Sequence, residues 1–393
     1  MNRNIHLYPW FKFVQQLVFW QATWFLYFET HLSAAEAILL YVVSDISTTA
    51  LEVPSGYMSD RVGRKFTLML AAISGVAATL MLIFSSSFLQ FAFANVLLAA
   101  SAAFASGTDS SLLYESLKAE DRTAELEKAE LIAWRYSFSA LAISALAGGV
   151  LAFYDDLLPY IGTAVSAVVL LVFTTLFKET PHVKQTSHGR TLRALLSQLT
   201  QPTLLWLLCL TLVMYVFSHI PFVFGQPFIR ETLASLGYAA QTPIISGGVT
   251  FAMMVVSLGT SLIALPLRNR LGLPGILLLA FGMQIALTAA LAISNSLFVV
   301  LLLFLRMVPD SLSQPFIRAR IQPLLQDGTR ATYMSVQSLA GRLLFAATLS
   351  IAAMRSGEAA IAYQDMQIIL AAYVGIGVVV LAGLIGTARR AGV

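Results

Sequence analysis

Charged residues are scarce in this chain. Asp, Glu, Lys and Arg make up 11% of its 393 residues, and hydrophobic residues make up 58%. A soluble globular protein has about 25% charged residues, so we expect most of this chain not to be exposed to water. Cysteine is nearly absent too. Cys209 is the single one, which excludes an intrachain disulfide, and we expect it to be a small buried hydrophobic residue.

The sequence also lacks the residue patterns of common enzymes. It has no Ser/His/Asp constellation, no His/Glu spacing that would bind a metal and no glycine-rich phosphate loop. The net charge of +4 does not indicate nucleic-acid binding, because the basic residues lie in short loops rather than in one patch. We therefore expect no enzyme, no metal or other cofactor, and no nucleic-acid partner.

Long apolar runs are what the sequence has instead. They recur along the whole chain, and a run of about 20 residues is long enough to cross a bilayer. Backbone polar groups in lipid must be bonded within the protein, so these runs are expected to be helices. We predict an all-α membrane protein with twelve spans, at 10–30, 36–56, 66–86, 88–114, 127–152, 157–177, 202–229, 241–267, 272–293, 296–318, 331–354 and 361–387.

One loop stands out by its length and polarity. Residues 178–201 are polar and basic and fall at the middle of the chain, whereas the other loops are mostly short. This segment contains a short amphipathic stretch, 190–199. We predict that it is a cytoplasmic linker between an N-terminal six-helix lobe, 1–177, and a C-terminal six-helix lobe, 202–393.

The basic residues predict the orientation of the spans. Twenty of the 24 lysines and arginines fall on the side of the termini and the even-numbered loops, whereas only Arg230 and Arg355 fall on the other side. Arg306 and Arg342 lie inside predicted spans. Lysine and arginine are concentrated on the cytoplasmic side of membrane proteins. Both termini are therefore predicted to be cytoplasmic, which agrees with an even number of spans.

The two predicted lobes repeat each other weakly but in register. Asp60–Gly63 aligns with Asn269–Gly272, and Asp109–Ser110 aligns with Asp310–Ser311. Ala133–Arg135 aligns with Ala340–Arg342. The matches fall at equivalent places of the two halves, so we predict parallel repeats related by an axis along the membrane normal.

The loop after the second predicted span carries the most informative string, Gly-Tyr-Met-Ser-Asp-Arg-Val-Gly-Arg-Lys at 56–65. The spacing Gly-x-x-x-Asp-Arg-x-Gly-Arg-Lys resembles the loop signature of the major facilitator superfamily, and the chain looks most similar to its bacterial drug:proton antiporter-like members. The resemblance implies two lobes that rock about a central substrate site. It also implies gating roles for the signature residues, Gly56, Asp60, Arg61, Gly63, Arg64 and Lys65.

The resemblance gives this signature a mechanical role. In the family, the Asp corresponding to Asp60 faces the start of the eleventh helix, here near Thr329–Thr332. Helix N-termini carry partial positive charge and favour such an anion. The basic signature residues can meet carboxylates at the end of the fourth span, of which Glu115, Glu120 and Asp121 are candidates. These contacts are expected to hold the outward-facing state. A solvated basic loop that only sets the topology is the alternative.

Ionisable residues inside a span are costly and therefore candidates for function. Asp45 lies near the middle of the second span and is the first candidate for carrying a proton, because desolvation raises the pKa of a carboxyl. The alternative is a carboxylate bonded to nearby hydroxyls. Asp109 with Arg135, and Asp310 with Arg342, are predicted ion pairs that brace adjacent spans, and the two aspartates are also candidates for proton coupling.

Other polar groups are candidates for binding a substrate. Arg306, close to the middle of the tenth span, is expected either to bind an anionic group or to hold Asp310 one turn away. His219 lies in the seventh span. The first and seventh spans line the cavity in this family, and they carry Gln21, Trp24 and Gln226 among many aromatic residues. Such a cavity suits apolar or amphipathic compounds. The alternative is that these aromatics face lipid.

These observations predict proton-coupled efflux of a small hydrophobic or amphipathic compound by a monomer in the bacterial inner membrane. The expected partners are the substrate, protons and the lipid bilayer. The fifth span reads Ser139–Gly149 without the Gly-Pro string of antiporter members, which leaves proton-coupled uptake of a metabolite or organic anion as an alternative. A non-transporting membrane receptor is the alternative of another class.

Overall fold

The computed structural model describes residues 2–32, 34–180, 200–235, 242–293, 301–326, 329–353 and 363–393. Within these ranges every regular element is an α-helix or a short 3-10 helix. Seven helical segments are long and apolar enough to cross a membrane. The described residues therefore form an all-α membrane protein. The amphipathic stretch 190–199 and most of the predicted linker lie outside them.

Two compact units make up the chain. The first comprises Met1–Leu196, Ala240–Val255 and Arg318–Val336, and the second comprises Ser197–Ala239, Val256–Ile317 and Gln337–Val393. Three helices contribute to both units, α11 (Thr242–Ile293), α13 (Val308–Ile321) and α14 (Arg330–Ala353). The division into lobes 1–177 and 202–393 stays a prediction.

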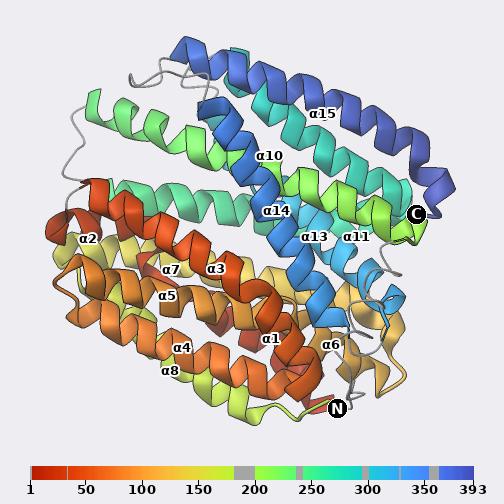
Figure 1. Cartoon of the computed structure of the whole chain (residues 1–393), viewed down its shortest axis with the longest axis horizontal. Helices are drawn as coiled ribbons and strands as arrows, with labels where there is room; N and C mark the ends of the chain where they lie inside the picture. The colour runs from red at the N-terminus through yellow and green to blue at the C-terminus, as the bar shows by residue number, and fades with distance from the viewer. Residues whose placement is uncertain are drawn as a thin grey trace. The chain divides into compact units, whose positions relative to one another are not determined.

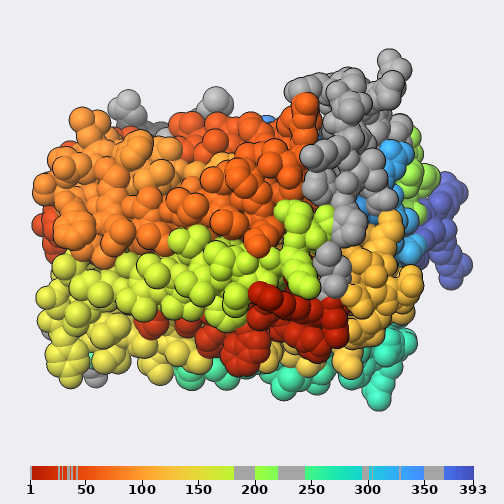
Figure 2. Space-filling model, turned by 90° about the horizontal axis from the view of Figure 1, so that it is seen from below, coloured from red at the N-terminus to blue at the C-terminus, as the bar shows by residue number. Residues whose placement is uncertain are grey.

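The first unit is built mainly from the N-terminal helices. These are α1 (Asn2–Gln15), η1 (Phe19–Ala22), α2 (Trp24–His31), α3 (Ala34–Val62), α4 (Arg64–Phe84), α5 (Phe88–Ala105), α6 (Thr108–Lys118), η2 (Thr123–Glu125), α7 (Leu126–Tyr154) and α8 (Leu158–Leu176). Helices α3 and α4 both pack against α5 (Figure 1). Helix α8, yellow-green in Figure 2, lies between α4 and α1.

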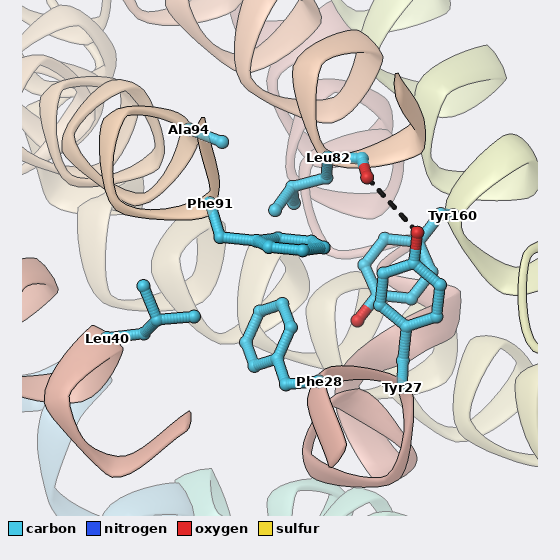
Figure 3. Packing of buried hydrophobic residues seen from close by; sticks show 7 residues of the cluster. All are labelled: Tyr27, Phe28, Leu40, Leu82, Phe91, Ala94 and Tyr160. Atoms are coloured by element: carbon cyan, nitrogen blue, oxygen red, sulfur yellow. Dashed lines mark hydrogen bonds between the residues drawn. The ribbon is translucent and has the colours of Figure 1, made fainter. Parts of the chain in front are cut away.

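An aromatic cluster fixes α2 within this unit. It brings together buried side chains from α2, α3, α4, α5 and α8, namely Tyr27, Phe28, Leu40, Leu82, Phe91, Ala94 and Tyr160 (Figure 3). The rings of Tyr27 and Tyr160 have centroids 4.1 Å apart. The Tyr27 hydroxyl donates a hydrogen bond of 3.2 Å to the carbonyl of Leu82. The bond satisfies the buried phenol of Tyr27 and helps to fix the position and rotation of α2.

The predicted span 10–30 is a broken helix rather than a continuous one. Helix α1 ends at Gln15, and α2 begins at Trp24 after the 3-10 turn η1. The break is stabilised by neighbouring helices, because the backbone N–H of Phe19 donates to Thr163 Oγ1 at 3.0 Å. Gly148 of α7 lies so close that a Cβ there would be 1.7 Å from the carbonyl oxygen of Phe19. Freed backbone groups at membrane depth require this kind of cover.

The predicted span 88–114 is also broken, between α5 and α6. Gly107 at the break has φ +69°, and a Cβ there would lie 2.5 Å from the side chain of Met334. Only glycine takes that conformation in so little space without strain. The aligned position of the second half is similar, since α13 (Val308–Ile321) begins just after the 3-10 turn η4 (Leu303–Leu305). As a result, Asp109 and Asp310 both lie in the first turn of a helix.

The aligned loops share a second feature, a glycine with positive φ. Gly63 between α3 and α4 has φ +136°, and Gly272 inside α11 has φ +73°. Non-helical backbone at Gly272 separates the predicted spans 241–267 and 272–293, so α11 comprises two helices that meet at this kink. The number of twelve spans stays a prediction.

The second unit packs α10 (Pro202–Ser235) against α15 (Tyr363–Ala391). Trp206 Nε1 donates to the carbonyl of Leu384 at 3.1 Å, and Phe217 fills the space that the missing side chain of Gly377 leaves. Cys209 is exposed on α10, so the expectation of a buried thiol is wrong. Apolar side chains of a membrane helix cover both its packed and its outer face, so apolar surroundings in sequence do not predict burial.

Candidate functional site

The first turn of α14 lies against the end of α3, and Asp60 joins them. Its Oδ2 accepts hydrogen bonds from the Thr332 backbone N–H at 2.8 Å and hydroxyl at 2.6 Å. Its Oδ1 accepts one from the Ala331 N–H at 3.2 Å. A carboxylate there bonds N–H groups that have no partner within the helix and meets the positive end of the helix dipole. Asp60 thus lies where the resemblance placed it, while its gating role stays a prediction.

Arg64 connects Asp60 to a second carboxylate. Its side chain is fully buried. One guanidinium nitrogen pairs with Asp60, and another pairs with Glu115 Oε1 at 2.7 Å. Guanidinium groups suit such sites because their planar fork bonds two acceptors at fixed angles. Of the three carboxylates that the sequence offered as partners, the structure brings Glu115 of α6 to Arg64.

Arg330, the first residue of α14, completes the charge balance. Its Nη1 lies 3.8 Å from Glu115 Oε1, and its guanidinium carbon lies 4.5 Å from the centre of the Tyr114 ring. We call Asp60, Arg64, Glu115, Arg330 and Thr332 the Asp60 network. Two carboxylates and two guanidinium groups balance each other in it, which is the condition under which charges remain buried.

Glu179 supports the network from the segment that follows α8 (Leu158–Leu176), and sequence reasoning missed it. Its carboxylate accepts hydrogen bonds from the backbone N–H groups of Arg64 at 2.7 Å and Lys65 at 3.1 Å. It therefore caps the first turn of α4. A Cβ on Gly63 would lie 2.6 Å from this carboxylate, which explains the glycine. An acidic residue directly after an apolar run was the only signal in the sequence.

The other two basic signature residues make contacts outside the Asp60 network. Arg61 Nη1 donates to the Tyr57 hydroxyl at 2.8 Å on the exposed side of α3. Lys65 Nζ donates to the carbonyl of Thr175 at 2.9 Å. The structure therefore brings three of the six signature residues, Gly56, Asp60 and Arg64, to the start of α14. The gating roles predicted for Arg61 and Lys65 stay predictions.

Gly56 allows α3 and α14 to approach each other closely. A Cβ there would lie 2.4 Å from Ser335 Oγ and 2.8 Å from the carbonyl oxygen of Ala331. We expect Gly56→Ala to lower the melting temperature of the purified protein, because the backbone carbonyl cannot turn away. The matched control is Gly282→Ala in α11, where no atom lies within 4 Å and alanine favours the helix. Equal melting temperatures for the two variants would contradict the close packing.

Asp109 forms an ion pair with Lys12 of α1, at 2.7 Å. Its other oxygen accepts the backbone N–H of Ser110 at 2.7 Å. Lys12 was not considered from the sequence, because nothing in the spacing links the end of α1 to the start of α6. The expected pair with Arg135 and the proton-coupling role of Asp109 stay predictions.

Asp45 lies in the middle of α3, and its side chain is exposed in the structure. The nearby hydroxyl of Thr48 donates to the carbonyl of Ser44 at 2.8 Å. The desolvation by protein that the sequence suggested for Asp45 is therefore not found in the described residues. Its proton-coupling role stays a prediction.

The candidate binding residues of the first span take part in packing within the first unit. Gln21 Nε2 donates to the carbonyl of Leu141 at 2.9 Å and to Ser144 Oγ at 3.1 Å, both on α7. Trp24 contacts the ring of Phe28 edge to face, with centroids 5.8 Å apart. Both side chains are half-buried. They fix η1 and α2, and contact with a substrate stays a prediction for them.

His219 belongs to an aromatic group in the second unit. Its ring stacks on Tyr215 with centroids 4.1 Å apart, and Phe345 of α14 lies 5.2 Å away. Nδ1 is 2.8 Å from the carbonyl of Tyr215, a contact in which a protonated Nδ1 donates to the carbonyl oxygen. The side chain of Gln226 lies outside the described residues.

Arg306 and Asp310 act on each other in the second unit. The main electrostatic interaction of each of these two side chains with another charged group is with the other one. Both side chains are half-buried. Binding of an anionic substrate by Arg306, proton coupling by Asp310 and the ion pair of Asp310 with Arg342 stay predictions. Among the described residues, no group of three or more His, Cys, Asp or Glu is placed to hold a metal ion.

Solved structures with similar folds are membrane transporters. The human organic anion transporter MFSD10 aligns with a TM-score of 0.73 at 13% identity, over 98% of this chain and 99% of that one. A bacterial homologue of the iron transporter ferroportin, in its outward-facing state, gives 0.70 at 16% identity over 99% of both chains. The nucleoside transporter NupG gives 0.61 at 15% identity, over 98% of this chain and 99% of that one.

Identities this low show the fold alone. No relative was found among curated proteins. The sequence profile of the Major Facilitator Superfamily, in contrast, matches residues 13–349, which is most of the chain and includes both the Asp60 network and the Arg306–Asp310 pair. The chain therefore belongs to the major facilitator superfamily and is a transporter rather than an enzyme.

Proposed function

We propose that this transporter works by alternating access and couples proton movement to the efflux of a small hydrophobic or amphipathic compound. The proposal includes twelve spans in two pseudo-symmetric lobes, cytoplasmic termini and a monomer in the bacterial inner membrane. The observation that carries it is the Asp60 network. A buried, charge-balanced set of hydrogen bonds holds the start of α14 and can be exchanged for bonds to water without breaking a helix.

A second close contact supports a two-state mechanism. Gly247 of α11 lies against α7, where a Cβ would be 2.6 Å from the carbonyl oxygen of Ala145 and 3.1 Å from Gly149 Cα. It and the Asp60 network each join a segment from the C-terminal half of the sequence to helices of the N-terminal half. Alternating access requires that these two contacts open one at a time.

The position of Asp45 favours a water-filled path along α3. A charge in lipid at mid-span is costly, so an exposed mid-span carboxylate is best explained by a polar, hydrated surface. We expect Asp45→Asn to abolish proton-coupled transport while the protein still folds, because the amide cannot bind and release a proton. The matched control is Asp156→Asn, the same change at an exposed site between α7 and α8. Unchanged pH dependence in Asp45→Asn would rule out a proton carried at Asp45.

The half-buried rings of Trp24 in α2 and Tyr215 in α10 support a hydrophobic or amphipathic substrate, whereas the Arg306–Asp310 pair supports an organic anion taken up with protons. Proteoliposomes with a pH-sensitive dye inside and an imposed pH gradient distinguish these. The panel should contain lipophilic cations, organic anions and nucleosides. Substrate-dependent proton movement identifies the class, and its sign gives the direction. The absence of proton movement with every compound would contradict proton coupling.

A further inference from the structure

A second cluster of buried charges lies in the first unit, apart from the Asp60 network. It brings together Lys12 of α1, Asp109 of α6, Glu130 of α7 and Arg318 in the last turn of α13. Within it, Asp109 is fully bonded, to Lys12 through one oxygen and to the Ser110 N–H through the other. Lys12 has two acceptors, because its Nζ donates to Gln15 Oε1 at 2.6 Å in addition to Asp109.

Glu130 is the member whose bonding is incomplete. Its side chain is 2% exposed, and its Oε1 has no hydrogen-bond partner among the described residues. The charged groups that interact with the Glu130 carboxylate are Arg318, Asp109 and Lys12, and Arg318 interacts with it most strongly. Arg318 lies with its guanidinium carbon 5.6 Å from the centre of the Trp134 ring, one turn along α7 from Glu130. Since Lys12 forms its ion pair with Asp109, Arg318 is the cation that balances the negative charge of Glu130.

Among the described residues, α1, η1, α8 and η2 also pack against α7, and none of them brings a further charge to Glu130. Helix α1 adds the phenol of Tyr8, whose buried hydroxyl has no hydrogen-bond partner among the described residues. Tyr160 is the only ionisable residue of η1 and α8, and it belongs to the aromatic cluster of Figure 3. In η2, Glu125 is exposed and pairs with Arg122 at 2.7 Å.

We propose that Glu130 is a proton-binding carboxyl whose charge is balanced by Arg318, and that it takes up a proton when the last turn of α13 moves away. Arg318 belongs to Arg318–Val336, the same segment that the Asp60 network holds at Thr332. The coupling rests on the alternating-access function proposed above, because that function supplies the movement of this segment.

Departure of Arg318 changes the balance of buried charges around Glu130. With Arg318 in place, two carboxylates face two cations. When Arg318 leaves, Glu130 and Asp109 share only Lys12, and an uncompensated buried carboxylate is far less stable than its neutral acid. A proton from water then binds the Glu130 carboxylate oxygen. Acidic pH therefore favours the open position of Arg318–Val336, and alkaline pH favours the closed one.

Infrared spectroscopy tests the proton site without any substrate. The full-length protein in lipid nanodiscs is titrated while the C=O stretch of protonated carboxyl groups is recorded. We expect Glu130→Gln to lose one titrating band that the wild type shows. Arg318→Gln should move the midpoint of that band upward by about one pH unit or more, because a nearby cation lowers a carboxyl pKa by about that much. Arg318→Lys should restore most of the wild-type midpoint.

Glu125→Gln is the control, since it makes the same change at an exposed residue of the neighbouring turn. Its titration should equal that of the wild type. Identical titrations of Glu130→Gln and the wild type would overturn the proton site, as would an unchanged midpoint in Arg318→Gln. Because the titration needs no transport, it can confirm Glu130 even if the proposed proton-coupled efflux fails. Transport without a Glu130 band would overturn this inference alone.

Thiol labelling tests the coupling. Ser335 of α14 is fully buried beneath Gly56, so a Ser335→Cys probe in a Cys209→Ser background reacts with a water-soluble maleimide only when the segment opens. Labelling should accelerate toward acidic pH in the otherwise wild-type protein. It should lose that pH dependence in Glu130→Gln, which mimics the protonated acid. The same pH dependence in both proteins would overturn the coupling.

Discussion

Replacing Arg64 with glutamine is expected to destabilise the protein by about 3–5 kcal/mol, the usual cost of removing one partner of a buried ion pair. Arg64 is fully buried and pairs with both Asp60 and Glu115. Its loss leaves two carboxylates in the interior with Arg330 as the nearest remaining cation of the network. Chemical or thermal unfolding of the purified protein in detergent measures the loss.

Three further variants make this result specific to the ion pairs. Arg64→Lys keeps the charge but lacks the planar fork, so we expect it to recover only part of the stability. Adding Glu115→Gln to Arg64→Gln removes one of the two carboxylates that lost their partner. The double variant should therefore be destabilised by less than the sum of the two single changes. Arg390→Gln changes an exposed arginine of α15 and should have little effect. A loss for Arg64→Gln as small as that control would contradict the buried network.

Asp60→Asn is expected to release the start of α14 rather than to unfold the protein. The amide keeps one acceptor oxygen but loses the negative charge that bonds the Ala331 and Thr332 N–H groups. Charge-assisted hydrogen bonds contribute about 1.5–3 kcal/mol. A loss of about 2 kcal/mol shifts the equilibrium between closed and open segments by about thirtyfold. Labelling of Ser335→Cys in a Cys209→Ser background should accelerate accordingly.

Asp156→Asn again provides the same chemical change at an exposed position, and its labelling rate should equal that of the parent. A rate in Asp60→Asn no faster than in this control would reduce the signature loop to a determinant of topology. That is the alternative the sequence left open, in which the basic residues of 56–65 only keep the loop on one side of the membrane.

The sequence predicted the membrane class, the signature loop and one ion pair of the Asp60 network correctly. Scarce charge and apolar runs are properties of composition, and the signature is a local string. Glu115 was a reasonable partner for Arg64 because few carboxylates lie at that end of the fourth span. The expectation for Cys209 failed because a membrane helix is apolar on its exposed face as well as on its packed one.

The parts that could not be predicted depend on contacts between distant segments. Lys12 meets Asp109, and Glu179 caps α4, only because α1, α6 and the segment that follows α8 meet in the folded protein. The breaks near Phe19 and at Gly107 occur where neighbouring side chains and backbone take over the freed hydrogen bonds or leave no room for a Cβ. No hydropathy pattern carries that information.

The sequence by itself thus determined that the chain is helical, resides in a membrane and carries the loop of the major facilitator superfamily, because hydropathy and short motifs act locally. Tertiary structure alone decided which charges are balanced. It brought Arg64 and Arg330 to Glu115 and left Glu130 with an oxygen that no donor reaches among the described residues. Burial and pairing are properties of the packed helices, and they decide which carboxylates hold a charge and which bind a proton.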